Sequence, residues 1–134
     1  MLVKPLTFMN QSGKYLRSLL SNNSCDLDKS ILVHDELTLP IGQMKISTGK
    51  SAGGHNGVKS IFDTLGNSLC RLRLGIGQKE NPDMALSDYV LTTFKQSEGQ
   101  LLESRSKHFL NALKSILDDG VEQAMNIYNQ PIKQ

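Results

Sequence analysis

The sequence has little of what large aromatic cores, covalent cross-links or membrane spans require. It contains no Trp, only 5% aromatic residues and two cysteines in 134 residues. A core without large aromatic side chains must consist mainly of Leu, Ile, Val and Met. The chain is nevertheless 38% apolar and 21% charged, which excludes disorder by composition. Because no repeat or linker divides it and its length is typical of one domain, we expect residues 1–134 to form a single domain.

Several classes of partner are also not supported by the sequence. No apolar run reaches the ~18 residues that cross a bilayer, and the first residues lack the pattern of a secretory signal. Cys25 and Cys70 fit no metal-ligand spacing, so both are expected to be reduced and structural. We therefore expect a cytoplasmic protein with no metal, cofactor or membrane partner. The net charge of +2 is too small to indicate a nucleic-acid partner by itself.

Hydrophobic periodicity predicts strands that alternate with helices, which favours an α/β fold. Ser97 and Gln100 fit a capping box that begins a long helix, which is expected to end near Gly120. The stretch 86–94 is ambiguous between a strand and a short helix. Strands are expected over 30–34, 43–48 and 69–77, and helices after Asn10, over 58–65, from about 97 to 119 and over 121–128, so that the C-terminal part, 95–134, is helical.

Three polar clusters stand at the ends of expected elements: Met9–Asn10, His34–Asp35–Glu36 and His55–Asn56. In α/β proteins, side chains at strand ends and helix N-termini converge in one crevice, so the clusters are candidates for a site. The alternative is that each cluster only caps a helix or forms a turn.

Asp35 is the best single candidate for acid–base work, because a carboxylate that leaves a buried strand is partly desolvated and could orient a histidine. The alternative for Asp35 is a turn-forming cap. His34 should lie on the opposite face of the strand, whereas His55 could reach Asp35 from another element. His108 is expected to be a surface or core histidine only.

Other catalytic motifs do not occur. The glycine-rich stretch 49–57 fits neither of the common phosphate-binding loops, and there is no Gly-x-Ser-x-Gly elbow or HExxH helix. A nucleotide site, a serine nucleophile and a zinc hydrolase are therefore not supported. Basic side chains on outward faces would suit a phosphate backbone, although they could be solvated charges only; they are Lys45, Lys50, Lys59, Arg71 and Arg73.

Four segments together resemble bacterial-type peptidyl-tRNA hydrolase: residues 4–13 (KPLTFMNQSG), 33–37 (VHDEL), 53–57 (GGHNG) and 71–77 (RLRLGIG). The resemblance implies an α/β single domain with a mixed, twisted sheet flanked by helices. It also implies cleavage of the ester between peptide and tRNA, which recycles stalled peptidyl-tRNA in translation. The family acts as a monomer and without a metal or cofactor.

The same resemblance implies roles for particular residues. Asn10 and Asn56 are implied to hold the peptidyl ester and the attacking water, and Asp35 to orient the catalytic histidine. Amide donors directed at a developing oxyanion are the expected stabilisers of such a reaction. Substrate-binding walls are implied for Phe8, Met9 and His55, and a clamp on the tRNA 5′ phosphate for Lys45 and Arg73.

The sequence differs from the family pattern in one respect. Members carry an N-terminal strand, a Gly-Asn-Pro-Gly loop and a Thr-Arg-His-Asn motif whose histidine is the general base, and the 134 residues contain neither motif. The expectation is that the first βα unit is missing, that activity is impaired and that sheet edges are unpaired. The alternatives are a truncated hydrolase, a non-catalytic tRNA-binding relative, or His55 as a substitute base.

Overall fold

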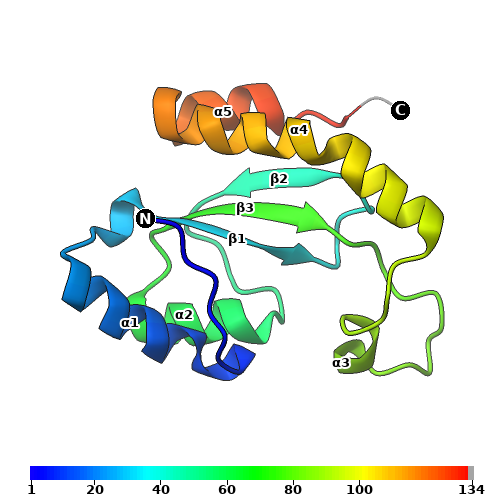
Figure 1. The fold of residues 1–134 in the computed structure, drawn as a ribbon, viewed down its shortest axis with the longest axis horizontal. Coiled ribbons are helices and arrows are strands. Elements are labelled where there is room, and N and C mark those ends of the chain that lie inside the picture. The colour runs from blue at the N-terminus through cyan, green and yellow to red at the C-terminus, as the bar shows by residue number, and fades with distance from the viewer. Residues whose placement is uncertain (133–134) are drawn as a thin grey trace. The chain divides into compact units, whose positions relative to one another are not determined.

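The computed structural model describes residues 1–132, and its centre is a small sheet. The strands are β1 (Ile31–Glu36), β2 (Met44–Ser47) and β3 (Cys70–Gly75), in the order β1-β3-β2. Figure 1 shows β1 and β3 pointing the same way and β2 the opposite way, so the sheet is mixed. The expected α/β class, with a mixed sheet flanked by helices, is confirmed.

The helices follow the predicted periodicity, with differences at their ends. The stretch that was ambiguous contains a single helical turn, α3 (Leu86–Tyr89). The capping box predicted at Ser97 and Gln100 is wrong, because the N–H of Lys95 donates to the Glu98 carboxylate at 2.7 Å. A carboxylate three residues inside the helix satisfies this otherwise unpaired N–H. The other helices are α1 (Ser12–Asn23), α2 (Asn56–Leu65), α4 (Gln96–Asp119) and α5 (Val121–Tyr128), with 3₁₀ turns η1 (Met9–Gln11) and η2 (Leu27–Lys29).

Contacts within the chain define two compact units. The first contains residues 1–34 and 47–71, and the second contains 35–46 and the chain from residue 72 onward. The single domain over 1–134 and the helical region 95–134 stay predictions, and residues 133–134 lie outside the part that the structure describes. Each unit is described separately below.

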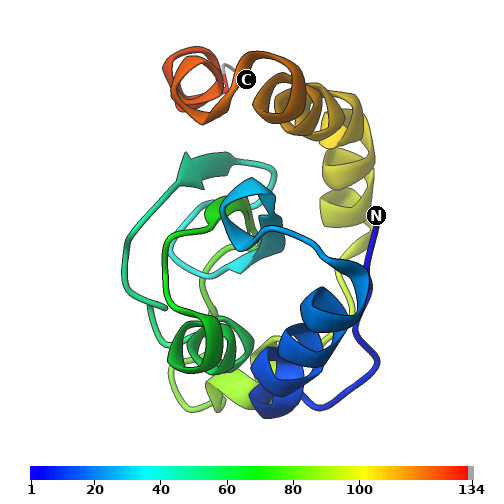
Figure 2. The same cartoon turned by 90° about the vertical axis from the view of Figure 1, so that its left-hand side faces the viewer.

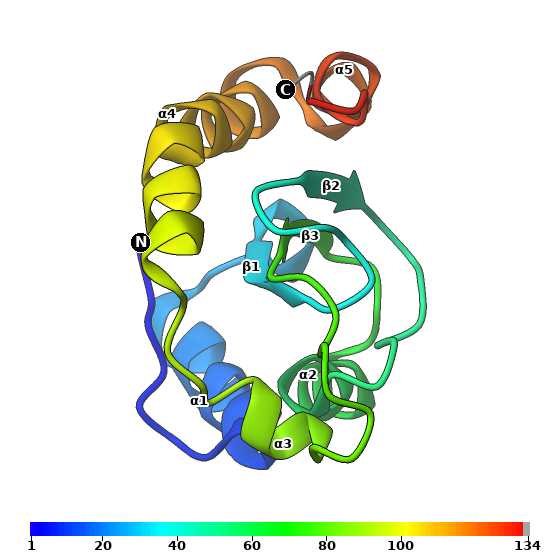
Figure 3. The ribbon, with the colours of Figure 1, turned by 90° about the vertical axis from the view of Figure 1, so that its right-hand side faces the viewer.

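In the first unit, α1 lies directly against α2 (Figure 3). The backbone N–H of Gly13 donates to the Ser60 hydroxyl at 3.0 Å. A Cβ atom at position 13 would lie 2.1 Å from the Ser60 carbonyl oxygen, so only glycine permits this approach. Val58 and Ile61 are buried on the apolar face predicted for α2.

In the second unit, α4 and α5 run side by side (Figure 2) and bury Ala112 and Ala124. The Asn129 side chain joins the end of α5 to β2, because its amide accepts from the Ile46 N–H at 2.7 Å and donates to the Ile46 carbonyl at 3.0 Å. Gln43 and Ile132 are paired in the same way. The side of β2 that strand pairing leaves open is thus satisfied at Ile46.

Candidate functional site

Two of the three polar clusters, Met9–Asn10 and His55–Asn56, lie at the N-terminal half of α2, and His34 of the third cluster contacts His55. Met9 and Asn10 lie in η1, and the Ser60 hydroxyl of α2 donates to the Asn10 carbonyl at 2.9 Å. The Met9 sulfur lies 3.0 Å from the place where a Cβ on Gly57 would be. Asn10 and Asn56 are both exposed here, as are Phe8 and Met9. Two amide side chains from distant parts of the sequence are therefore presented to solvent at one end of α2.

His55 is the N-cap of α2, and this fixes the state of its ring. Its Nδ1 accepts from the backbone N–H groups of Gly57, at 3.1 Å, and Val58, at 3.2 Å. A nitrogen that accepts a hydrogen bond carries no proton, so the neutral ring has its proton on Nε2. The His55 side chain thus caps α2. Protonation at Nδ1 would break both bonds.

His34 is the aromatic neighbour of His55, a contact that the sequence analysis did not anticipate. The two ring centroids lie 5.1 Å apart in an edge-to-face arrangement. The sequence suggested only that His55 could reach Asp35. The alternation of side chains along β1 placed His34 and Asp35 on opposite faces, but it does not show which element packs against either face.

The third polar cluster contains a carboxylate with several hydrogen-bond partners, that of Glu36. Asp35 is half-buried, whereas Glu36 is 8% exposed. Glu36 Oε1 accepts from the Thr38 N–H at 3.0 Å and from its hydroxyl at 2.8 Å. Oε2 accepts from Arg73 Nε at 2.8 Å and lies 2.7 Å from Nη2. Burial raises the pKa of Glu36, but the hydrogen bonds from Thr38 and Arg73 and the charge of Arg73 outweigh it, so the pKa lies below its ordinary value.

The prediction that the basic strand residues face outward is confirmed for Lys45 and wrong for both arginines. Lys45 is exposed on β2. Arg71 is only 2% exposed, and its guanidinium lies 5.2 Å from the centre of the Phe62 ring. The Arg73 side chain is 17% exposed because it is paired with Glu36. Buried guanidinium groups are tolerated when an aromatic face or a carboxylate compensates for lost hydration.

Three other residues behave as the sequence predicted. His108 packs its ring against Tyr128, with centroids 5.3 Å apart, as a histidine of a helical core would. Cys25 and Cys70 are free thiols, and burial raises the pKa of Cys70. None of the three contributes to the polar clusters.

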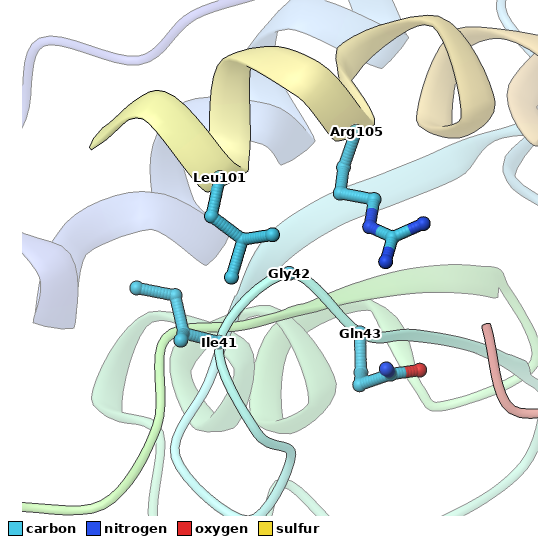
Figure 4. A pocket seen from close by; sticks show the side chains of 5 residues that line it. All are labelled: Ile41, Gly42, Gln43, Leu101 and Arg105. Carbon is cyan, nitrogen blue, oxygen red and sulfur yellow. The ribbon is translucent and has the colours of Figure 1, made fainter. Parts of the chain in front are cut away.

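A cavity of about 320 Å³ lies in the second unit, between α4 and the turn before β2 (Figure 4). It contains none of the site residues that the sequence predicted. Within residues 1–132 no three potential metal ligands of the His, Cys, Asp or Glu type come together, and no helix has the length and apolar character to cross a membrane. The cavity is lined by Ile41, Gly42, Gln43, Leu101 and Arg105.

Comparison with known proteins decides the family. The family model described as peptidyl-tRNA hydrolase matches residues 1–134. The chain belongs to the peptidyl-tRNA hydrolase family. It is 40% identical over 130 residues to the peptidyl-tRNA hydrolase of Lachnospira eligens, covering 96% of this chain and 69% of that protein. It is 43% identical over 129 residues to that of a Thermotoga species, with 96% and 69% covered.

Solved structures of peptidyl-tRNA hydrolases have the same fold. The Acinetobacter baumannii enzyme superposes with a TM-score of 0.84 at 31% identity, covering 95% of this chain and 64% of that one. A complex of peptidyl-tRNA hydrolase with N-propanol gives a TM-score of 0.86 at 31% identity, covering 97% and 66%. The chain thus spans 64% to 69% of the length of these relatives.

Proposed function

We propose that this peptidyl-tRNA hydrolase family member takes part in hydrolysis of the ester bond between a peptide and tRNA, which returns stalled peptidyl-tRNA to translation. The observation that supports the proposal is that the turn with Asn10 packs against α2, the helix that begins at Asn56, and that both residues are exposed. These are the two amides that the family resemblance implicates in holding the ester and the water.

The chemistry of this end of α2 suits ester hydrolysis. Water attacks the carbonyl carbon, negative charge develops on the carbonyl oxygen, and the ribose oxygen of the tRNA leaves with a proton. Amide N–H groups of Asn10 and Asn56 would stabilise the oxyanion, and an amide oxygen would orient the water. Phe8, Met9 and His55 would form the walls around the ester. Asp35 would orient the family's catalytic histidine, whose Thr-Arg-His-Asn motif does not occur in these 134 residues.

Lys45 and Arg73 would bind the 5′ phosphate of the tRNA. Lys45 is exposed, and Arg73 has more N–H donors than its ion pair occupies. Action as a monomer, without metal and in the cytoplasm, stays a prediction of the family resemblance.

The test is hydrolysis of N-acetylaminoacyl-tRNA by the purified chain and its variants. We expect Asn10→Ala and Asn56→Ala each to lower kcat about 10²–10³-fold, the usual effect of removing one oxyanion donor. The matched control is Asn111→Ala, which removes an exposed amide on α4. Thermal unfolding of each variant separates lost chemistry from lost folding.

Equal turnover by both site variants and the control would contradict the roles assigned to the two amides. Binding of tRNA without any hydrolysis by the unaltered chain would contradict the catalytic proposal and favour a non-catalytic tRNA-binding relative.

A further inference from the structure

Glu36 is a buried ionisable residue to which the proposed reaction assigns no role. Both oxygens of its carboxylate accept hydrogen bonds: Thr38 donates twice to Oε1, and Arg73 donates to Oε2. Its backbone carbonyl also accepts from the Ile76 N–H at 3.1 Å. Glu36 therefore ties together the end of β1, the turn that follows it and the neighbouring strand β3.

The geometry at Arg73 leaves part of the guanidinium available. Nε and Nη2 both approach the single oxygen Oε2, at 2.8 and 2.7 Å. A guanidinium has five N–H donors, so about three are left for another anion. The Arg73 side chain is 17% exposed, so it is not fully enclosed by the protein.

Fixing the guanidinium in advance favours phosphate binding. A free arginine side chain loses about 2 kcal/mol of rotamer entropy when it is immobilised. The Glu36 ion pair has already removed that freedom in the folded protein. The two hydrogen bonds from Thr38 stabilise the carboxylate charge at Oε1, away from the oxygen that holds Arg73.

We propose that Glu36 is a positioning residue that holds the Arg73 guanidinium in the orientation in which its remaining N–H donors bind a terminal phosphate of the tRNA. This inference rests on the proposed function and deepens it. The proposed reaction assigns Glu36 no role at the ester, and its carboxylate would act through Arg73.

The test compares the binding of two tRNAs that differ only at the 5′ end, one with a phosphate and one with a hydroxyl. The unaltered chain should prefer the phosphate by about 10-fold, the size of a charge-assisted hydrogen bond. Glu36→Gln keeps the size of the side chain and an acceptor for Thr38 but removes the charge. Glu36→Gln should reduce the preference for the 5′ phosphate to less than about threefold, and Arg73→Lys should have the same effect. The double variant should lose no more of this preference than either single variant.

Glu103→Gln is the matched control, since it neutralises an exposed carboxylate on α4 and should leave the preference unchanged. If Glu36→Gln does not fold, Thr38→Val replaces it, because that variant removes only the hydroxyl bond to Oε1 and should also lower the preference.

An undiminished preference in the folded Glu36→Gln protein, or in Thr38→Val where it is used instead, would overturn the inference. So would the absence of any preference in the unaltered chain. Neither result bears on ester hydrolysis, which the Asn10 and Asn56 variants test separately.

Discussion

At the scale of single residues, the charged and polar side chains of this protein are defined by their partners more than by their positions in the sequence. Glu36 and Arg73 form an ion pair within the second unit, so each charge offsets the lost hydration of the other. His55 uses one ring nitrogen to accept the hydrogen bonds that cap α2. A buried charge with a good partner costs little, whereas the same charge left alone destabilises the fold by several kcal/mol. The roles of Glu36 and His55 follow from these bonds.

The lowered pKa of Glu36 makes stability depend on acidity. A carboxylate whose folded pKa lies below its unfolded value stabilises the protein above the unfolded value, and this contribution is lost as the pH falls through the folded pKa. The ordinary pKa of a glutamate such as Glu36 is 4.5. At pH values below 4.5 we expect the free energy of unfolding to decrease as the pH is lowered, and to decrease less steeply in Glu36→Gln. At neutral pH the substitution should cost about 1–3 kcal/mol. Urea denaturation at a series of pH values measures both effects.

Glu103→Gln serves as the control because that carboxylate is exposed. Parallel pH curves for the unaltered chain and Glu36→Gln would show that the ion pair does not contribute to acid sensitivity.

At the scale of elements, the helices were predictable because their apolar residues recur locally, but how closely they pack was not. Val58 and Ile61 of α2 are buried as the periodicity predicted. The close approach of α1 at Gly13 depends on a backbone oxygen of another helix, Ser60, which no local pattern identifies. The helix ends were the least predictable, since Glu98 caps α4 where Ser97 was expected.

Gly13→Ala should therefore be strongly destabilising. The added Cβ would lie 2.1 Å from the Ser60 carbonyl oxygen, so α1 and α2 must separate and lose part of their buried surface. We expect a loss of about 2 kcal/mol or more, as for other overpacked sites. The control is Gly99→Ala in α4, where no atom lies within 4 Å of the new Cβ and helix propensity should raise stability by up to about 1 kcal/mol. If the denaturation midpoints of Gly13→Ala and Gly99→Ala shift in the same direction, this explanation is wrong.

At the scale of the whole molecule, the small net charge of +2 means that the proposed binding of tRNA must depend on where the basic residues are placed. Lys45 is exposed, whereas Arg71 is buried against Phe62 and is not presented to a phosphate backbone as the sequence suggested. Binding to tRNA should thus involve few phosphate contacts.

We expect tRNA affinity to fall as salt rises, with a modest slope. Lys45→Ala should reduce the slope of log affinity against log salt by about 1, the value for one lost phosphate contact. Lys29→Ala is the control, since that side chain is 84% exposed and paired with Asp26. Titrations at several salt concentrations measure the slopes, and equal slopes for the two variants would remove Lys45 from the interface.

The sequence by itself determined the α/β class, the three strands and the helices, because hydrophobic periodicity depends on residues that are close along the chain. It also indicated the family, through motifs whose residues need no spatial information to be recognised. Only the tertiary structure decided that His34 meets His55, that Arg73 pairs with Glu36 and that Asn129 satisfies Ile46. These partners are distant in sequence, and alternation along a strand shows which face a side chain occupies but not what lies against it.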